Sequence, residues 1–217
     1  MKKTISVILA LSLVLVCVFA LGACKKNETA IWGLAASASP TKTVTIVEYV
    51  TADGEQLNGQ YTMQVEGDDS IFDFSYERFR TVADGYNDES YDRIKSVSGT
   101  VYYKDGLFSE DGDSWETGVP TALDLRFDLK EEYLTNVSID ETDTVLTAEI
   151  TPDNVAKVLG TDLSASGNVS ITVETNGASL TRVYISCTTD TGATLSIRTS
   201  YTYNPITLTF PSDEASA

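Results

Sequence analysis

The chain contains no histidine. This absence excludes Ser-His-Asp and Cys-His catalysis, histidine-ligated zinc and a pH switch built on imidazole. Cysteine is scarce too, with three residues in 217. Because no histidine can act as its base, Cys187 is a poor candidate nucleophile. We expect it to be a small, buried side chain on a strand.

Positive charge is also in short supply. The sequence has 15 lysines and arginines against 32 acidic residues, which gives a formal net charge of −17. Such a surface repels the phosphates of nucleic acids and anionic lipid headgroups, so nucleic acid is excluded as a partner.

The acidic residues cluster in two predicted turns, and carboxylates of this kind could hold calcium. No segment has the spacing of the twelve-residue calcium loop, so we expect solvated turn charges and no metal or cofactor. Two carboxylates could also hydrolyse a glycoside, but that reaction needs a defined separation across a cleft, which the sequence does not show. We therefore expect a protein that is not an enzyme. The two clusters are Glu110, Asp111 and Asp113, and Asp140, Glu141 and Asp143.

One long hydrophobic run stands out, from Ile5 to Ala23 after Lys2 and Lys3. Its length would allow it to span a bilayer. A charged start, an apolar centre and small residues at the end are also typical of a secretory signal peptide. An uncleaved anchor helix remains the alternative, and both interpretations leave residues 25–217 outside the cytoplasm.

The end of this run, Leu21-Gly22-Ala23-Cys24, resembles the bacterial lipobox. The resemblance implies that residues 1–23 are a lipoprotein signal peptide, that Cys24 receives a diacylglyceryl group, and that the chain is cut before it. Two acyl chains, at about 0.8 kcal/mol per buried methylene, make a stable membrane anchor. The expected location is extracytoplasmic, on the bacterial cell membrane. Acylation would consume the Cys24 thiol and leave Cys187 without a disulfide partner.

The remaining chain is expected to form one domain. Residues 24–41 are rich in Ala, Ser and Gly and predict a lipidated N-terminus on a flexible tether, in which Trp32 either rests at the membrane interface or, as we expect, packs on the domain. The pattern of residues 42–211 predicts an antiparallel β domain. Residues 212–217 are expected to form a disordered C-terminal tail.

Alternating apolar residues predict antiparallel strands. Examples are Val44 with Ile46, Tyr61 with Met63 and Val65, and Phe72 with Phe74 and Tyr76. Turn pairs between such runs predict hairpins at Asp53-Gly54, Asp105-Gly106, Asn176-Gly177 and Thr191-Gly192. The C-terminal part predicts a three-stranded meander whose inward residues are Val169, Ile171, Val173, Val183, Ile185, Cys187, Leu195 and Ile197, together with Tyr201 and Tyr203.

Two helices are predicted. Thr151 is a good N-cap before Pro152, Val155 and Val158 give an apolar stripe, and Gly160 ends the helix. The second lies within residues 120–136, where Leu123 and Phe127 fit helical spacing but alternation also fits a strand. Residues 81–95 read as a long charged connection.

These features together resemble the LolA/LppX-like lipoproteins of bacteria. The resemblance rests on the lipobox, many short antiparallel strands, the hairpin VYYKDGLFSEDGDSWET at 101–117, and Tyr201-Thr202-Tyr203-Asn204 leading into 206–211. It implies a mainly β (α+β) fold, in which a curved antiparallel sheet or half-barrel carries one or two short helices on its concave face. Several such proteins hold a lipid between sheet and helices.

Two functions follow. In the first, a non-catalytic, lipid-anchored envelope lipoprotein binds a hydrophobic or amphiphilic ligand in a pocket lined by Met63, Phe72, Phe74, Ile171, Ile185 and Leu195. In the alternative, the same residues fill a solid core, as interiors usually do, and the domain is an interaction module for an envelope protein. The sequence leaves both open and identifies neither ligand nor protein partner.

Overall fold

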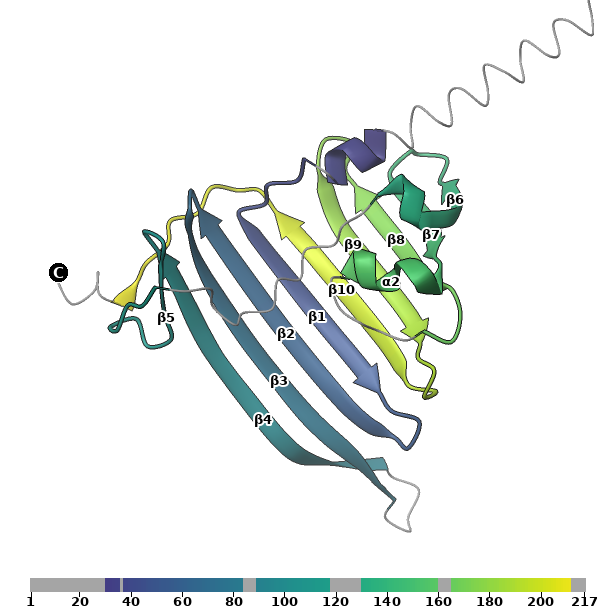
Figure 1. Ribbon diagram of the computed structural model, residues 1–217, viewed down its shortest axis with the longest axis horizontal. Helices are drawn as coiled ribbons and strands as arrows, with labels where there is room; N and C mark the ends of the chain where they lie inside the picture. Colours follow the sequence, from purple (N-terminus) through teal and green to yellow (C-terminus); the bar gives the residue numbers. More distant parts are fainter. Residues whose placement is uncertain (1–29, 36, 84–88, 118–129, 160–164, 212–217) are drawn as a thin grey trace, which may run out of the picture.

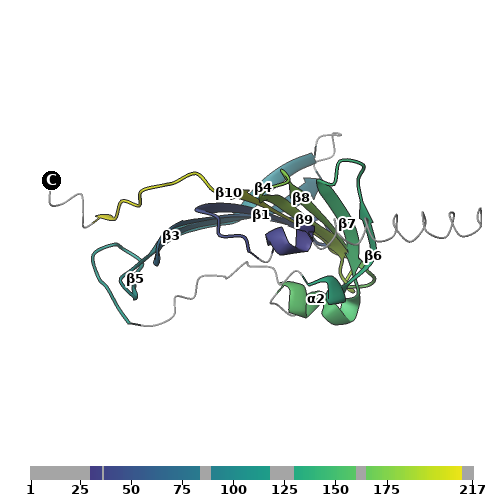
Figure 2. The ribbon, with the colours of Figure 1, turned by 90° about the horizontal axis from the view of Figure 1, so that it is seen from above.

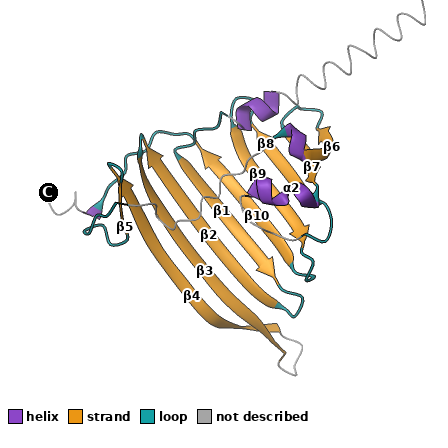
Figure 3. Cartoon of the chain, in the orientation of Figure 1, coloured by secondary structure: helices purple, strands orange, loops and turns teal. Residues whose placement is uncertain are grey.

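The computed structural model describes residues 30–35, 37–83, 89–117, 130–159 and 165–211, with backbone alone at 80–83, 89–94 and 159. Over these residues the fold is mainly β, as predicted (Figure 1; Figure 3). Ten strands form a single open sheet in which every pairing is antiparallel. In this part of the chain, no helix is both long and apolar enough to cross a bilayer.

The strands and helices follow one another with short turns. The elements are β1 (Lys42–Val50), β2 (Glu55–Glu66), β3 (Asp69–Ala83), β4 (Glu89–Lys104), β5 (Leu107–Ser109), η1 (Glu131–Tyr133), β6 (Leu134–Ile139), β7 (Val145–Ile150), α2 (Pro152–Leu159), β8 (Val169–Thr175), β9 (Leu180–Thr188) and β10 (Thr194–Thr202). Residues 30–35 are also helical.

The strand order is β5-β4-β3-β2-β1-β10-β9-β8-β7-β6. Two meanders, β1–β5 and β6–β10, therefore meet where the first strand pairs with the last. Nine residue pairs, from Lys42 opposite Thr202 to Val50 opposite Thr194, join them. The sheet is continuous across this seam (Figure 1).

Tight turns place the glycines where a left-handed backbone is required. Asp105 and Gly106 have φ values of 54° and 79° between β4 and β5, as a type I′ hairpin turn demands. Gly54, Gly177 and Gly192 also have positive φ. All four predicted hairpins are confirmed.

The two faces of the sheet differ. We call the face that carries Val47, Ile197, Ile185 and Ile171 the helix face, since residues in register across neighbouring strands share a face. The other is the outer face. Figure 2 shows residues 30–35 and α2 on the same side of the sheet, with β6 and β7 bending toward them. The predicted curved sheet with short helices on its concave face is confirmed.

The helices close a hydrophobic core over β7–β10. Val155 and Val158 of α2 are 0% exposed and belong to the same buried cluster as Ile31 and Trp32. Burying one such side chain contributes about 1.5–3 kcal/mol. The α2 prediction is confirmed: it begins at Pro152 after Thr151.

The structure differs from two sequence interpretations and covers a third only in part. Residues 81–83 and 89–95 are strand rather than a charged connection, because β3 and β4 are long and pair in register beyond a bulge at Arg78/Phe79. Within the predicted tether, residues 30–35 are helical, and Trp32 packs in the core, as expected. Of the second predicted helix, 120–129 lies outside the described residues; η1 makes one short turn before β6 begins at Leu134.

A C-terminal strap, residues 204–211, crosses the outer face near β3–β5. Leu208 and Phe210 pack with Ile71, and Trp115 and Tyr102 meet the ring of Phe210 edge-on. The Leu208 backbone N–H donates to a Glu66 carboxylate oxygen at 2.8 Å. The strap therefore fixes the far edge of the sheet to its centre.

Candidate functional site

The residues predicted to face a ligand all lie on the helix face. Register places Met63 opposite Phe72, Ile171 opposite Ile185, and Ile185 opposite Ile197. Phe74 follows Phe72 by two positions, and Leu195 precedes Ile197 by two. The structure nevertheless separates them into two groups along the sheet.

The first group is core. Ile171 and Ile185 are 1% and 0% exposed, and Leu195 packs against the same cluster beneath the helices. Cys187, opposite Leu195, is half-buried there, and burial raises the pKa of its thiol. These side chains fill the interior of the fold, and a raised pKa keeps the thiol unreactive at neutral pH.

The second group belongs to an aromatic platform on β2 and β3, which we define as Tyr61, Phe72, Phe74 and Tyr76. The ring centroids of Tyr61 and Phe72 are 6.2 Å apart with planes 19° from parallel, and those of Phe72 and Phe74 are 6.2 Å apart at 29°. Phe72 is buried and the other three rings are half-buried. Since Phe72 is only 6% exposed, the accessible apolar surface comes from the half-buried rings of Tyr61 and Phe74, which lie opposite each other on β2 and β3.

Two glycines allow rings of the platform to lie close to the sheet. A Cβ on Gly99, opposite Phe74, would come within 2.8 Å of the ring carbon Cζ. A Cβ on Gly59 would lie 3.0 Å from the Tyr61 ring. Because glycine has no Cβ at these two positions, the rings of Phe74 and Tyr61 can pack directly against the backbone of the sheet. The sequence offered a signal for them, since a glycine inside a strand often marks a close approach.

Polar groups border the platform. Burial, and then the neighbouring Tyr76, raise the pKa of the Tyr61 phenol, which stays neutral. Beyond Tyr76, Arg78 of β3 lies directly opposite Lys95 of β4. The Arg78 guanidinium bonds Glu55, and the Lys95 ammonium lies 5.6 Å from the Tyr76 ring centroid. The sequence does not reveal this pair of cations, because residues 81–95, which include Lys95, read as a connection instead of a strand.

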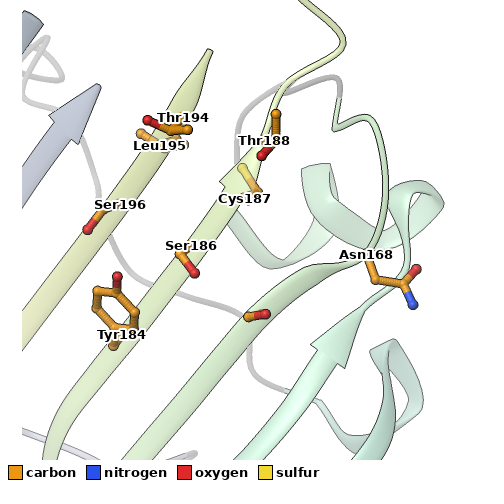
Figure 4. A pocket seen from close by; sticks show the side chains of 9 residues that line it. Asn168, Tyr184, Ser186, Cys187, Thr188, Thr194, Leu195 and Ser196 are labelled. Atoms are coloured by element: carbon orange, nitrogen blue, oxygen red, sulfur yellow. The ribbon is translucent and has the colours of Figure 1, made fainter. Parts of the chain in front are cut away.

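A shallow depression of about 410 Å³ lies over β8–β10 (Figure 4). Its lining includes Ser170, Ser186 and Ser196, which stand in register on the outer face, and Tyr184, a 39% exposed ring. The depression and the platform thus lie on opposite faces. Its polar lining of small hydroxyls does not suit an apolar ligand, so the platform is the better candidate site.

Acidic side chains in the two turns accept hydrogen bonds from the backbone of their own turn. One Asp140 carboxylate oxygen accepts the N–H groups of Thr144 and Val145 at 2.8 and 2.9 Å. Asp111 likewise accepts the N–H groups of Ser114 and Asp113 at 2.8 and 2.9 Å, and these bonds lower its pKa. Within the described ranges, no three acidic or cysteine side chains converge as a metal site.

Comparison with known proteins gives little. No protein-family model matches the chain, and no curated protein matches it. Among solved structures, kievitone hydratase from Nectria haematococca is similar over 80% of this chain, with 13% identity and a TM-score of 0.27. The match spans 52% of that protein, about half its length. The predicted lipobox residues Leu21, Gly22, Ala23 and Cys24, and the tail 212–217, lie outside the described residues.

Proposed function

We propose that this chain is a non-catalytic lipoprotein of the bacterial cell envelope, anchored through Cys24, that binds an apolar or amphiphilic ligand on its aromatic platform. The observation that carries the proposal is the platform itself, in which the half-buried rings of Tyr61 and Phe74 pack in near-parallel orientation against the buried ring of Phe72. Of the predicted lining residues, the proposed site keeps Phe72 and Phe74 on β3 and omits those that pack in the core beneath the helices.

We interpret the aromatic platform as a ligand surface and not as a second hydrophobic core. The described helices pack over β7–β10, while the rings on β2 and β3 are held in place by glycines and by one another. Pre-organised apolar surface binds without the cost of ordering side chains. A tail or flat apolar group laid along these rings would bury further apolar area, at about 25 cal/mol per Å².

The test is native mass spectrometry of the chain from Lys25 onward, purified gently from a bacterial host, with lipid analysis of any bound mass. A discrete ligand near one-to-one occupancy is the expected result. An apo protein that stays apo when offered lipids would contradict the proposal.

A matched pair of variants locates the site. Gly99→Ala pushes the Phe74 ring off the sheet and should reduce ligand occupancy several-fold, with an overpacking cost of about 1–3 kcal/mol seen in thermal unfolding. Gly167→Ala is the control, because a Cβ there meets nothing within 4 Å. Equal ligand loss in both variants would place the ligand elsewhere.

The alternative proposal is an interaction module for an envelope protein. The observation that favours it is the tight packing of Ile171 and Ile185, which leaves the helix-covered half of the face as core. Under this proposal a partner protein, and no lipid, would protect the platform from hydrogen exchange. A native mass spectrum that shows only the ligand-free protein would favour this alternative.

A further inference from the structure

The charges of this acidic chain are sorted between the two faces of its sheet. By strand register, the described acidic side chains of the strands lie on the outer face, with one exception, Glu55. The outer-face set is Glu48, Glu66, Asp69, Asp73, Glu77, Glu149 and Glu174. The helix face is therefore the one sheet surface on which an anion would not meet a field of carboxylates.

Two cations lie together at the end of the platform. Arg78 and Lys95 occupy directly opposed positions on β3 and β4. Opposed residues in a sheet have Cβ atoms about 4.5–5.5 Å apart, and like charges there repel. Such a pair is unexpected in a chain with a net charge of −17.

Among the side chains that the structure describes, Glu55 is the acid on this face, and it pairs with one of the two cations. Glu55 is 14% exposed at its side chain and bonds the Arg78 guanidinium. Lys95 is exposed, its ammonium rests over the Tyr76 ring, and no described carboxylate pairs with it. Among these described side chains, two cations thus face one carboxylate, and the remaining positive charge could be neutralised by an anion.

The spacing from rings to cations fits an amphiphile. Phe72, Phe74, Tyr76 and Arg78 follow one another on one face of β3, so the row is about 20 Å long at about 3.3 Å per residue. One acyl chain occupies about half of the roughly 30 Å hydrocarbon core of a bilayer, or about 15 Å. A tail lying on the rings would bring its headgroup to Lys95.

We infer that the platform takes an anionic amphiphile, with its tail on the half-buried rings of Tyr61 and Phe74 and its negatively charged headgroup at Lys95 beside Arg78. This inference rests on the proposed function and adds the headgroup class. Phosphate, sulfate and carboxylate heads share the chemistry that a lysine recognises. The net charge of the whole chain disfavours an anion at long range, so the selectivity comes from this local arrangement.

The experiment uses the full chain in vesicles of phosphatidylcholine. Two photoreactive lysolipids with identical oleoyl tails are offered, one with a phosphoglycerol head and one with a phosphocholine head, and labelled peptides are located by mass spectrometry. We expect the anionic probe to label β2–β4 peptides about two- to fivefold more strongly, which is the upper part of the range for one partly exposed ion pair. Raising the salt concentration should reduce this preference.

Lys95→Gln should abolish the headgroup preference while leaving tail labelling of β2–β4 in place. Arg198→Gln is the matched control, because Arg198 is an exposed cation on the outer face. Unchanged thermal unfolding confirms that both variants fold.

The outcomes separate the two proposals. Equal labelling of β2–β4 by both probes would overturn the anion inference and leave the apolar site standing. A preference that survives Lys95→Gln would overturn the headgroup assignment. Absence of label from β2–β4 with either probe would overturn the apolar site as well.

Discussion

At the scale of single residues, hydrogen bonds decide where polar groups can be buried in this sheet. Thr45 and Thr199 are 4% and 1% exposed on the helix face, and their hydroxyl oxygens are 2.9 Å apart. One hydroxyl donates to the other, so both buried oxygens have a hydrogen-bond partner. The alternation around Val44 and Ile46 predicts a strand correctly, but the side that faces the core carries the threonines.

Asp140 offers a pH test of the β6–β7 turn. Hydrogen bonds, first from the Thr142 hydroxyl and then from the Val145 N–H, lower the pKa of this carboxyl to about 2. Since a lowered pKa stabilises the fold above the ordinary pKa, that contribution is present at neutral pH and is lost as pH falls from about 4 to about 2.

Asp140→Asn should therefore lower the melting temperature at pH 7, and the difference from the wild type should shrink across this range. Thermal unfolding followed by circular dichroism at several pH values measures it. Glu141→Gln, a change at an exposed neighbour, is the control. A difference that stays constant down to pH 2 would refute the role assigned to the carboxylate.

At the scale of elements, short segments outside the strands complete the core. The helical residues 30–35 bury Ile31 to 2% and Trp32 to 8% exposure. The strap 204–211 buries Phe210 to 3% on the other face. Each segment covers apolar side chains of the sheet, one on the helix face and the other on the outer face.

Ile31→Ala tests whether the N-terminal helical residues belong to the domain. A buried isoleucine cut to alanine costs about 2–5 kcal/mol, whereas a change in a flexible tether costs within about 0.5 kcal/mol. Urea unfolding of the chain from Lys25 onward gives the number. Ser39→Ala, at an exposed position, serves as control, and equal stability of the two variants would assign residues 30–35 to the tether.

Phe210→Ala tests the strap. Removing this ring takes away the packing of Tyr102 and Trp115 and the Lys104 ammonium 4.8 Å above it. A buried phenylalanine cut to alanine costs about 3–5 kcal/mol.

Hydrogen exchange should show faster opening of β4 and β5 in Phe210→Ala, while β8 and β9 keep their protection. Thr209→Ala, at an exposed position of the same strap, should change neither. Uniform loss of protection across the sheet would mean that the strap stabilises the whole fold instead of one edge.

Local sequence patterns predict local structure here and little beyond it. The inward positions Val169, Ile171 and Ile185 follow from alternation, and α2 follows from its cap and stripe, because both depend on near neighbours. The site could be predicted only in part. Phe72 and Phe74 were identified as a pair, but pairing across strands brings Lys95 beside Tyr76, and register between distant segments has no short-range signal.

At the scale of the whole molecule, the proposed lipid anchor at Cys24 would hold the sheet at the membrane surface. If Cys24 is the lipidated residue, Cys24→Ser should leave the precursor uncut and free of acyl label. Radiolabelled fatty acid and gel mobility measure both in a bacterial host. Cys17→Ser, within the same apolar run, should behave like the wild type. Normal cleavage and membrane retention of Cys24→Ser would refute the lipobox assignment.

The pairing of β1 with β10 has a consequence for timing. Lys42 pairs with Thr202, so the centre of the sheet forms between segments separated by most of the described chain. Contacts of such long sequence separation form late and slowly. A chain of this kind, if threaded outward from its N-terminus, would hold β1–β5 as an unfinished sheet until its last strand emerged. Because β1 can pair with β10 only after β10 has emerged, the sheet would be completed only once export is over.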